Sequence, residues 1–180
     1  MALKANGVAA LRIWPVNVEL GGAVYRIAPH PAIKWITSIV DDDWGAIFPG
    51  MIDASDNSVD EALDEGRILH ADCLRAARDA VTAASGMPWW SAAKLVISVV
   101  ESPAVTGEMA LCGLDAQTVG LGAFVAAAYR IFTRDADKKQ LARIDREIMH
   151  APAGLTIAER ADLTDGASGF EEMMHQRGGP

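Results

Sequence analysis

Residues 14–28 have the sequence WPVNVELGGAVYRIA, and this stretch separates the start of the chain from everything that follows it. Val16, Val18 and Leu20 recur at the period of two that a half-buried β-strand requires. Gly21-Gly22 then supplies two residues that tolerate positive φ, and β-forming residues resume directly after it. The stretch therefore predicts a β-hairpin over about residues 14–28.

Beyond the hairpin, apolar residues recur at spacings of three and four, which is the pattern of amphipathic helices. Pro31, Pro49-Gly50, Gly86-Met87-Pro88 and Pro152 divide this region into segments, because proline and glycine favour helix starts and ends. We predict a short element at 44–48 and helices over about 31–40, 58–85, 89–101, 117–132 and 134–148. The sequence thus predicts a mainly α fold, in which the N-terminal hairpin is followed by a bundle of about five to six helices.

The length of the chain favours a single domain with a tail. We assign residues 1–152 to one globular domain, with the helical bundle over about residues 31–150. Residues 153–180 are rich in glycine and acidic residues, and we predict that they form a flexible, partly disordered tail.

The composition limits the classes of partner. The chain has 180 residues, a formal net charge of −8 and a pI of about 4.9, so it would repel a phosphate backbone and we expect no nucleic-acid partner. The N-terminus lacks the apolar core of a signal peptide, and the longest apolar stretch, residues 114–129, is shorter than the roughly 20 residues that cross a bilayer. We therefore expect a soluble cytoplasmic protein with no membrane partner.

Metal-binding residues do not gather at the spacings that metal sites use. His70 and Cys73 are three residues apart on a predicted helix, but structural zinc needs four ligands and Cys112 has no close partner. We expect both thiols to be small buried hydrophobes in helices, with no disulfide. The run Asp41–Asp43 lacks the spaced acidic loop of a calcium site, so a solvated helix end is the favoured interpretation.

The sequence also lacks the common motifs of catalytic and cofactor-binding sites. Ser91 lies outside any G-x-S-x-G turn, and Gly120-Leu121-Gly122 lacks the third glycine and the preceding strand of a dinucleotide site. The 24 acidic residues provide many coincidental carboxylate pairs, so a small helical enzyme stays an open alternative. We predict a non-enzymatic protein with no cofactor, no metal and no catalytic residues.

Aromatic residues are the best candidates for contacting a partner. Trp89 and Trp90 are adjacent on a predicted helix, so their rings point about 100° apart and one of them can lie near the surface. An exposed Trp is typical of interface hot spots. The favoured alternative is that both rings pack inside the protein. The partner-binding residues that we predict are Trp35, Trp44, Phe48, Trp89 and Trp90.

Several stretches together resemble the tail assembly chaperones of long-tailed phages that infect actinobacteria. The first is Val18–Ile27 followed by Trp35-Ile36, the second is Ile47-Phe48-Pro49-Gly50, and the third is Ala84–Trp90 at the head of a helix. The helix Leu121–Tyr129 and the charged helix after it, which ends near Pro152, also fit the pattern.

The resemblance implies a protein that binds the long, helical tape-measure protein and keeps it soluble until tail-tube subunits polymerise around it. Its partners would then be the tape-measure protein and the tail-tube subunits, in the cytoplasm of the host cell. The alternative is a virion structural protein, such as a head-tail connector or a tail component. A frameshifted longer form is a further property of the family.

Charge is also divided unevenly along the chain. The first 40 residues hold four basic residues and a single acidic one, whereas residues 41–65 hold nine acidic residues and no Lys or Arg. Such a division would permit copies to associate head to tail, so a homo-oligomer is a further hypothesis.

Overall fold

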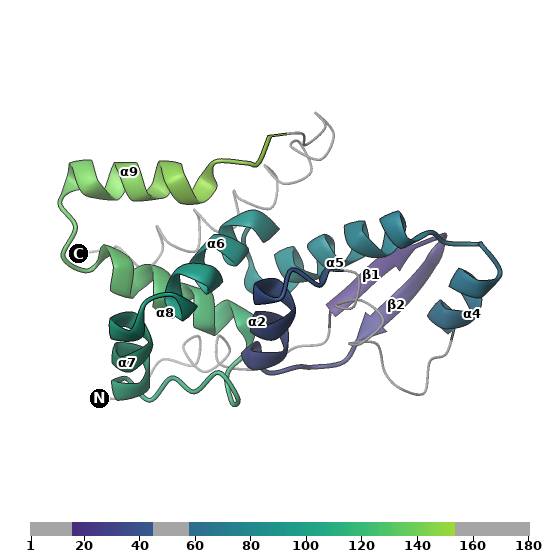
Figure 1. Ribbon diagram of the computed structural model, residues 1–180, viewed down its shortest axis with the longest axis horizontal. Helices are drawn as coiled ribbons and strands as arrows, with labels where there is room; N and C mark the ends of the chain where they lie inside the picture. The colour runs from purple at the N-terminus through teal and green to yellow at the C-terminus, as the bar shows by residue number, and fades with distance from the viewer. Residues whose placement is uncertain (1–15, 45–57, 154–180) are drawn as a thin grey trace.

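The computed structural model describes residues 16–44 and 58–153, which form a two-stranded hairpin and seven helices (Figure 1). The elements are β1 (Val16–Leu20), β2 (Ala23–Ile27), α2 (Ala32–Val40), α4 (Ser58–Asp64), α5 (His70–Ser85), α6 (Trp89–Val100), α7 (Pro103–Leu111), α8 (Leu121–Thr133) and α9 (Lys138–Met149). The predicted mainly α fold behind an N-terminal hairpin is confirmed. The hairpin, α4 and one end of α5 form one end of the molecule, and α9 lies along the edge of the other end (Figure 1).

The hairpin is antiparallel, with Val16 paired to Ile27 and Leu20 paired to Ala23. Gly21 and Gly22 have φ of 59° and 80°, so the turn uses the positive φ that their sequence predicted. A Cβ atom on Gly21 would also lie 2.8 Å from Ile68, so only glycine fits between this turn and the start of α5. The alternating side chains of β1 are buried and exposed in turn, which places its apolar face against α5.

The centre of the core is the alanine-rich face of α5, which packs against β1, α6 and α8. Ala76, Ala77 and Ala80 are at most 1% exposed, and their small side chains let the neighbouring elements approach. Gly122 serves the same purpose from α8, because a Cβ there would lie only 3.1 Å from the carbonyl oxygen of Ala84. The backbones of α8 and the end of α5 therefore approach each other closely at this glycine.

One predicted helix over 58–85 is wrong, since the chain forms two helices there. The first, α4, ends at Asp64, and the chain reverses at Gly66, which has a φ of 69°. The amide of Arg67 donates to the carbonyl of Ala62 at 2.8 Å, which closes the end of α4. Ile68 then enters the core at 3% exposure, and α5 starts at His70 in a new direction. The helical spacing of apolar residues continues across the turn at Gly66, so the sequence pattern did not indicate the break.

A helix at 103–111, α7, was not predicted, and α8 begins at Leu121 rather than near residue 117. Only Met109 of α7 is buried, so this helix carries no apolar stripe that a sequence pattern would reveal. The segment between α7 and α8 crosses the start of α2, where the amide of Ala32 donates to the carbonyl of Val119 at 2.7 Å. The segment between α7 and α8 therefore accepts a hydrogen bond from the N-terminus of α2 instead of extending α8.

Two predictions fall largely outside the described residues: the element 44–48 beyond Trp44 and the tail from residue 154. Cys73 is 1% exposed, as expected of a core thiol, and both cysteines are free. The prediction of a buried Cys112 is wrong, because it follows the last turn of α7 and is exposed. In the described part of the chain, no helix combines the length and the apolar character that crossing a membrane requires.

Candidate functional site

Three of the predicted partner-binding residues form one aromatic cluster. The ring of Trp89 stands edge-on to Trp44, with 5.2 Å between the ring centroids, and edge-on to Trp90 at 5.8 Å. The indole Nε1 of Trp44 donates to a carboxylate oxygen of Asp42 at 3.0 Å, which holds that ring in place. The cluster therefore joins the end of α2 to the first turn of α6.

Arg78 of α5 lies over the ring of Trp89. Its guanidinium carbon lies 4.5 Å from the centroid of the Trp89 ring, which is the geometry of a cation–π contact. The amide of Trp89 donates to the hydroxyl of Thr82 at 3.1 Å, so α5 also fixes the start of α6. Trp89 is thus held from two sides and remains only partly accessible.

The five predicted residues do not share one surface. Trp35 is 2% exposed and Trp90 is 7% exposed, so both are core side chains that offer almost no area to a partner. Trp44 and Trp89 are half-buried, and Phe48 lies outside the described residues. The burial of Trp35 follows from its place on α2, between Ala32 and Ile39, on the face that packs against the core. We therefore do not carry Trp35 or Trp90 into the candidate site.

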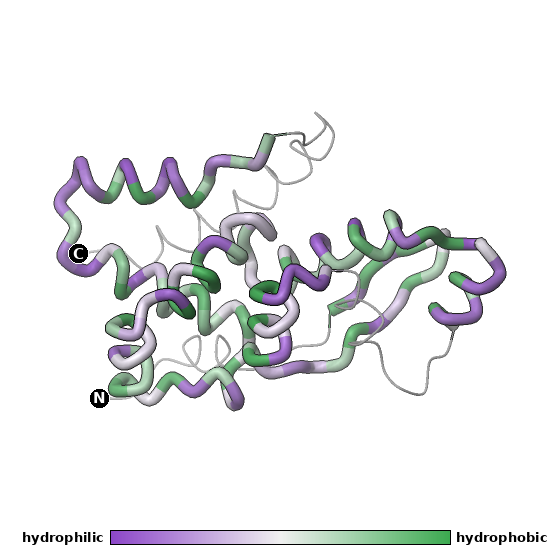
Figure 2. Tube along the Cα trace, in the orientation of Figure 1, coloured by the Kyte–Doolittle hydropathy of each residue, from purple (hydrophilic) through white to green (hydrophobic). Residues whose placement is uncertain are grey.

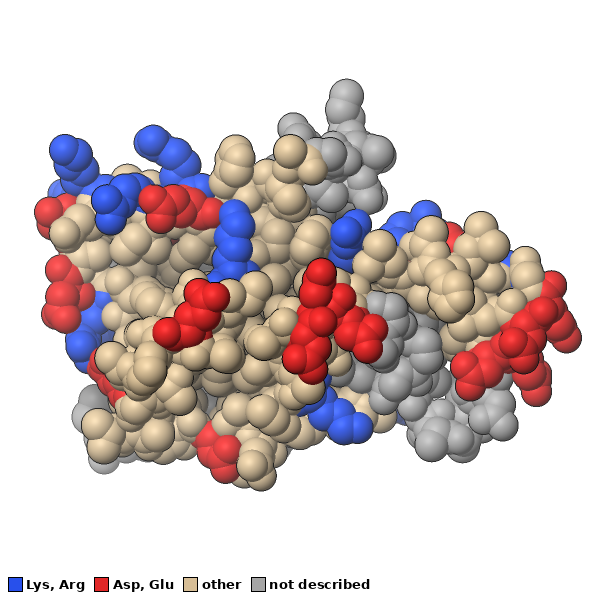
Figure 3. Space-filling model, in the orientation of Figure 1, with Lys and Arg blue, Asp and Glu red and all other residues tan. Residues whose placement is uncertain are grey.

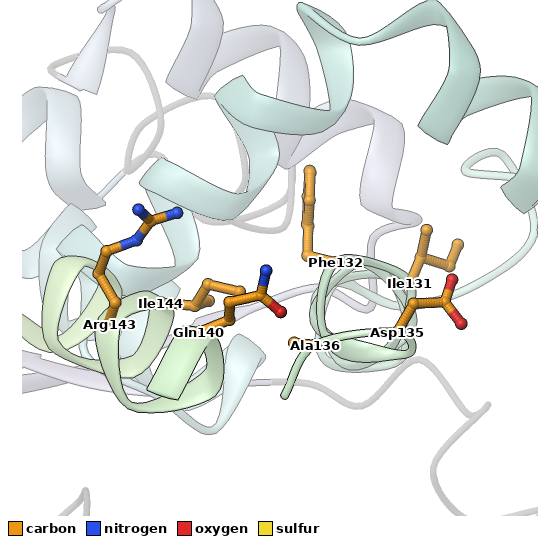
Figure 4. Close-up of a pocket in the computed structure, with 7 residues that line it drawn as sticks. All are labelled: Ile131, Phe132, Asp135, Ala136, Gln140, Arg143 and Ile144. Carbon is orange, nitrogen blue, oxygen red and sulfur yellow. The ribbon is translucent and has the colours of Figure 1, made fainter. Parts of the chain in front are cut away.

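A second surface, which we call the α8–α9 groove, lies between the last turns of α8 and the middle of α9 (Figure 4). The groove has a volume of about 260 Å³. Its lining is Ile131, Phe132, Asp135, Ala136, Gln140, Arg143 and Ile144. The close-up shows Gln140 and Ile144 extending from α9 toward α8 (Figure 4). The lining thus combines apolar side chains from both helices with polar side chains of α9 and of the turn before it.

The apolar side chains of α9 are only half covered. Leu141, Ile144 and Ile148 form its apolar stripe, and no residue of α9 is fully buried. Figure 2 shows the corresponding alternation of hydrophobic and hydrophilic positions along this helix. The hydrophobic effect therefore contributes less to holding α9 than it does to holding α5 or α6.

Polar contacts take over this role at both ends of α9. At its start, the carboxylate of Asp137 accepts from the amides of Lys139 and Gln140, both at 2.8 Å, and the side chain of Gln140 accepts from the amide of Asp137 at 2.9 Å. This reciprocal pair is a capping box. It places the helix start at Lys138, four residues after the start that the sequence predicted.

At the end of α9, side chains of α6 bond to its last carbonyl groups. The ammonium of Lys94 donates to the carbonyls of Glu147 and His150, both at 2.7 Å. The hydroxyl of Ser91 donates to the carbonyl of Ile148 at 3.0 Å. A cation is favourable there because carbonyl groups at a helix C-terminus carry partial negative charge. Burial lowers the pKa of Lys94 from its usual value, while Glu147 opposes that effect.

The side of α9 is joined to α8 by one strong hydrogen bond. The hydroxyl of Tyr129 donates to a carboxylate oxygen of Asp145 at 2.5 Å. Burial raises the pKa of Tyr129 well above its usual value, and the hydrogen bond to Asp145 and its charge add to the rise. The two titratable groups with shifted pKa values near the groove, Lys94 and Tyr129, therefore both hold α9 in place.

Few of the described residues have the chemistry of a reactive or metal-binding group. Burial raises the pKa of Cys73, and the charge of Asp72 raises it further, so its thiol is a poor nucleophile at neutral pH. The part of the chain that the structure describes holds no group of three or more His, Cys, Asp or Glu side chains placed to bind a metal ion. The α8–α9 groove offers apolar contact and hydrogen bonding.

Sequence reasoning missed the α8–α9 groove. Ile131, Phe132 and Ile144 have ordinary helical spacing, which predicts burial in the core. The available signal was the strongly charged opposite side of the last helix, since a helix with so much polar surface must lie at the edge of the bundle.

The chain matches no protein-family model, no curated protein and no solved structure.

Proposed function

We propose that this protein is a non-enzymatic phage tail assembly chaperone. In this proposal it binds the tape-measure protein in the cytoplasm of the host cell and keeps it soluble while tail-tube subunits assemble. The sequence resemblance supplies the identity of the client, and the geometry of the α8–α9 groove supports binding of a polypeptide.

The observation that carries the proposal is the half-covered apolar stripe of α9 beside the groove. Such a surface suits the apolar face of an amphipathic client helix, which would complete the burial of Ile144 and Phe132. The volume of about 260 Å³ is below the roughly 300–1,000 Å³ of small-molecule pockets. Anchor side chains of a bound helix therefore fit this site better than a metabolite does.

The charge of the protein supports the same role. A client with exposed apolar stripes aggregates unless its complexes repel one another. The formal net charge of −8 on 180 residues provides that repulsion once the stripes are covered.

Co-expression with the tape-measure protein tests the proposal. We expect the unaltered protein to keep the client in the soluble fraction and to co-purify with it. Ile144→Asp should place a charge among the apolar side chains that line the groove, so the client should sediment while the variant itself stays soluble. Leu111→Asp is the matched control, since Leu111 is 90% exposed and lies outside the groove.

Two results would overturn the proposal. One is the absence of a complex between the unaltered protein and the tape-measure protein. The other is the presence of this protein as a stoichiometric component of purified phage particles, which would favour the alternative of a virion structural protein.

A further inference from the structure

The outer face of α9, away from the groove, is rich in basic residues, and no described helix or strand covers these side chains. Lys139 and Arg146 are exposed at helical positions i and i+7, and Lys138 lies beside them. Arg143 stands between this face and the groove that it also lines, and it pairs with Glu147 of the same helix at 3.8 Å. Four of the 16 Lys and Arg residues of the chain lie in this one helix. Figure 3 shows Lys and Arg side chains gathered along this edge of the molecule. We call this surface the basic face.

The short helix α4 is acidic, and a hollow of about 470 Å³ lies between it and the start of α5. Asp60 and Asp64 line it together with Leu63, Ile68 and Leu69. Leu69 is 63% exposed, so an apolar side chain lies open beside the carboxylates. Glu61 is exposed on α4, Glu65 follows the helix and pairs with Arg67, and Figure 3 shows the resulting acidic surface at one end of the molecule. We call this hollow and its carboxylates the acidic corner.

The two surfaces lie at opposite ends of the molecule, so they do not meet within one copy (Figures 1 and 3). We propose that the basic face of one copy docks in the acidic corner of a second copy. The contact is heterologous, because each copy uses two different surfaces, and it therefore adds copies head to tail.

The chemistry of the two surfaces supports a second copy as the occupant. Lys and Arg have long apolar stems that end in a charge, and such side chains lay the stem on apolar surface while the charge meets a carboxylate. In the acidic corner, Leu63 and Leu69 offer the apolar surface, and Asp60 and Asp64 offer the carboxylates. The basic face presents several such side chains in one row.

Charge also selects this pairing over others. The chain is acidic as a whole, so most surfaces of two copies repel each other. The basic face is a dense local exception, and the acidic corner is its complement. Each exposed ion pair contributes little alone, so we expect reversible association that depends on salt.

The salt dependence of the molecular mass is the first test. We expect light scattering to give a mass above that of the 19.1 kDa monomer at about 0.01 M salt, where charges act over about 30 Å. At about 1 M salt, where the range falls to about 3 Å, the mass should return to that of the monomer. A monomer at both salt concentrations and at high protein concentration would overturn the proposal.

Charge reversal is the second test. Lys139→Glu with Arg146→Glu changes the basic face without altering the groove lining, and Asp60→Lys with Asp64→Lys changes the acidic corner. Each pair of substitutions alone should weaken association about tenfold, which corresponds to about 1.4 kcal/mol. The matched controls are Arg26→Glu with Lys34→Glu, and Glu19→Lys with Glu101→Lys, which change the same charges at exposed positions elsewhere.

Mixing the two reversed variants separates docking from damage to the fold. Each variant then offers the other a complementary surface, so the mixture should regain the mass of the unaltered protein. Recovery in the mixture supports the proposal. Equal weakening by the control variants, or no recovery in a mixture of folded variants, would overturn it.

Discussion

The centre of the bundle and the helix α9 are held by different forces. Around α5 and α6, whole faces are buried, and residues such as Ala80 and Val96 have no exposed surface. α9 buries no residue completely and depends on carbonyl groups that accept from Lys94 and Ser91, on a capping box and on one Tyr–Asp hydrogen bond. α9 can therefore loosen while the centre stays folded, because it buries little apolar surface and is held mostly by polar contacts.

Truncation of a core side chain should have the largest effect. Trp35→Ala removes a ring that is 2% exposed, so we expect the free energy of unfolding to fall by about 3–5 kcal/mol. Urea denaturation followed by circular dichroism measures this loss. Because the cavity lies in the centre, all probes should report one transition. If Trp35→Ala lowered the free energy of unfolding no more than a substitution in α9 does, the centre and α9 would not differ in how they are held.

Removal of the Lys94 ammonium should have a smaller and local effect. Lys94→Met keeps most of the stem but removes both hydrogen bonds to the end of α9, and we expect a cost of about 1–2 kcal/mol since the group is partly exposed. Hydrogen exchange should accelerate in α9 and stay unchanged in α5. Lys34→Met is the matched control on an exposed Lys of α2 and should change neither helix. Faster exchange throughout the protein would show that α9 and the centre unfold together.

The Tyr129–Asp145 hydrogen bond should have the smallest effect, and that effect depends on pH. At neutral pH, Tyr129→Phe should cost about 1 kcal/mol. The fold raises the pKa of this hydroxyl above its unfolded value of about 10, so the folded state holds the proton more tightly. The stabilisation is therefore fully present below pH 10 and is lost as the pH rises above it.

The pH dependence is measured as the difference in unfolding free energy between the unaltered protein and Tyr129→Phe. The difference should be constant below pH 10 and should shrink above it. Asp145→Asn offers a control, because it keeps an oxygen that accepts from the hydroxyl but removes the charge. A difference that grows with pH would contradict the assigned direction of the pKa shift.

The parts of the fold that the sequence predicted are those with strong local signals. Gly21-Gly22 between alternating apolar residues determined the hairpin, and Pro88 marked the start of α6 to within one residue. The break at Gly66 was missed because apolar spacing continues through it, and α7 was missed because only Met109 on it is buried. In both cases tertiary contacts, rather than local propensity, decide the structure.

The candidate site was less predictable than the fold. Trp35, Trp89 and Trp90 were chosen for their residue type, but burial depends on which neighbour covers each ring, and that is a property of the assembled bundle. The α8–α9 groove depends on how far α9 stands from α8. Lys94 and Tyr129 set that position, and their partners lie 53 and 16 residues further along the chain. The sequence pattern of a single helix does not indicate contacts between residues of different helices.

The bonds between α6 and the end of α9 also order the events of synthesis. Ser91 and Lys94 leave the ribosome well before the carbonyls at 147–150 that they bind, because the chain is made from its N-terminus. Until then, the donors of α6 are solvated and the groove does not exist. The α8–α9 groove can therefore take its final form only after residues 147–150 have left the ribosome.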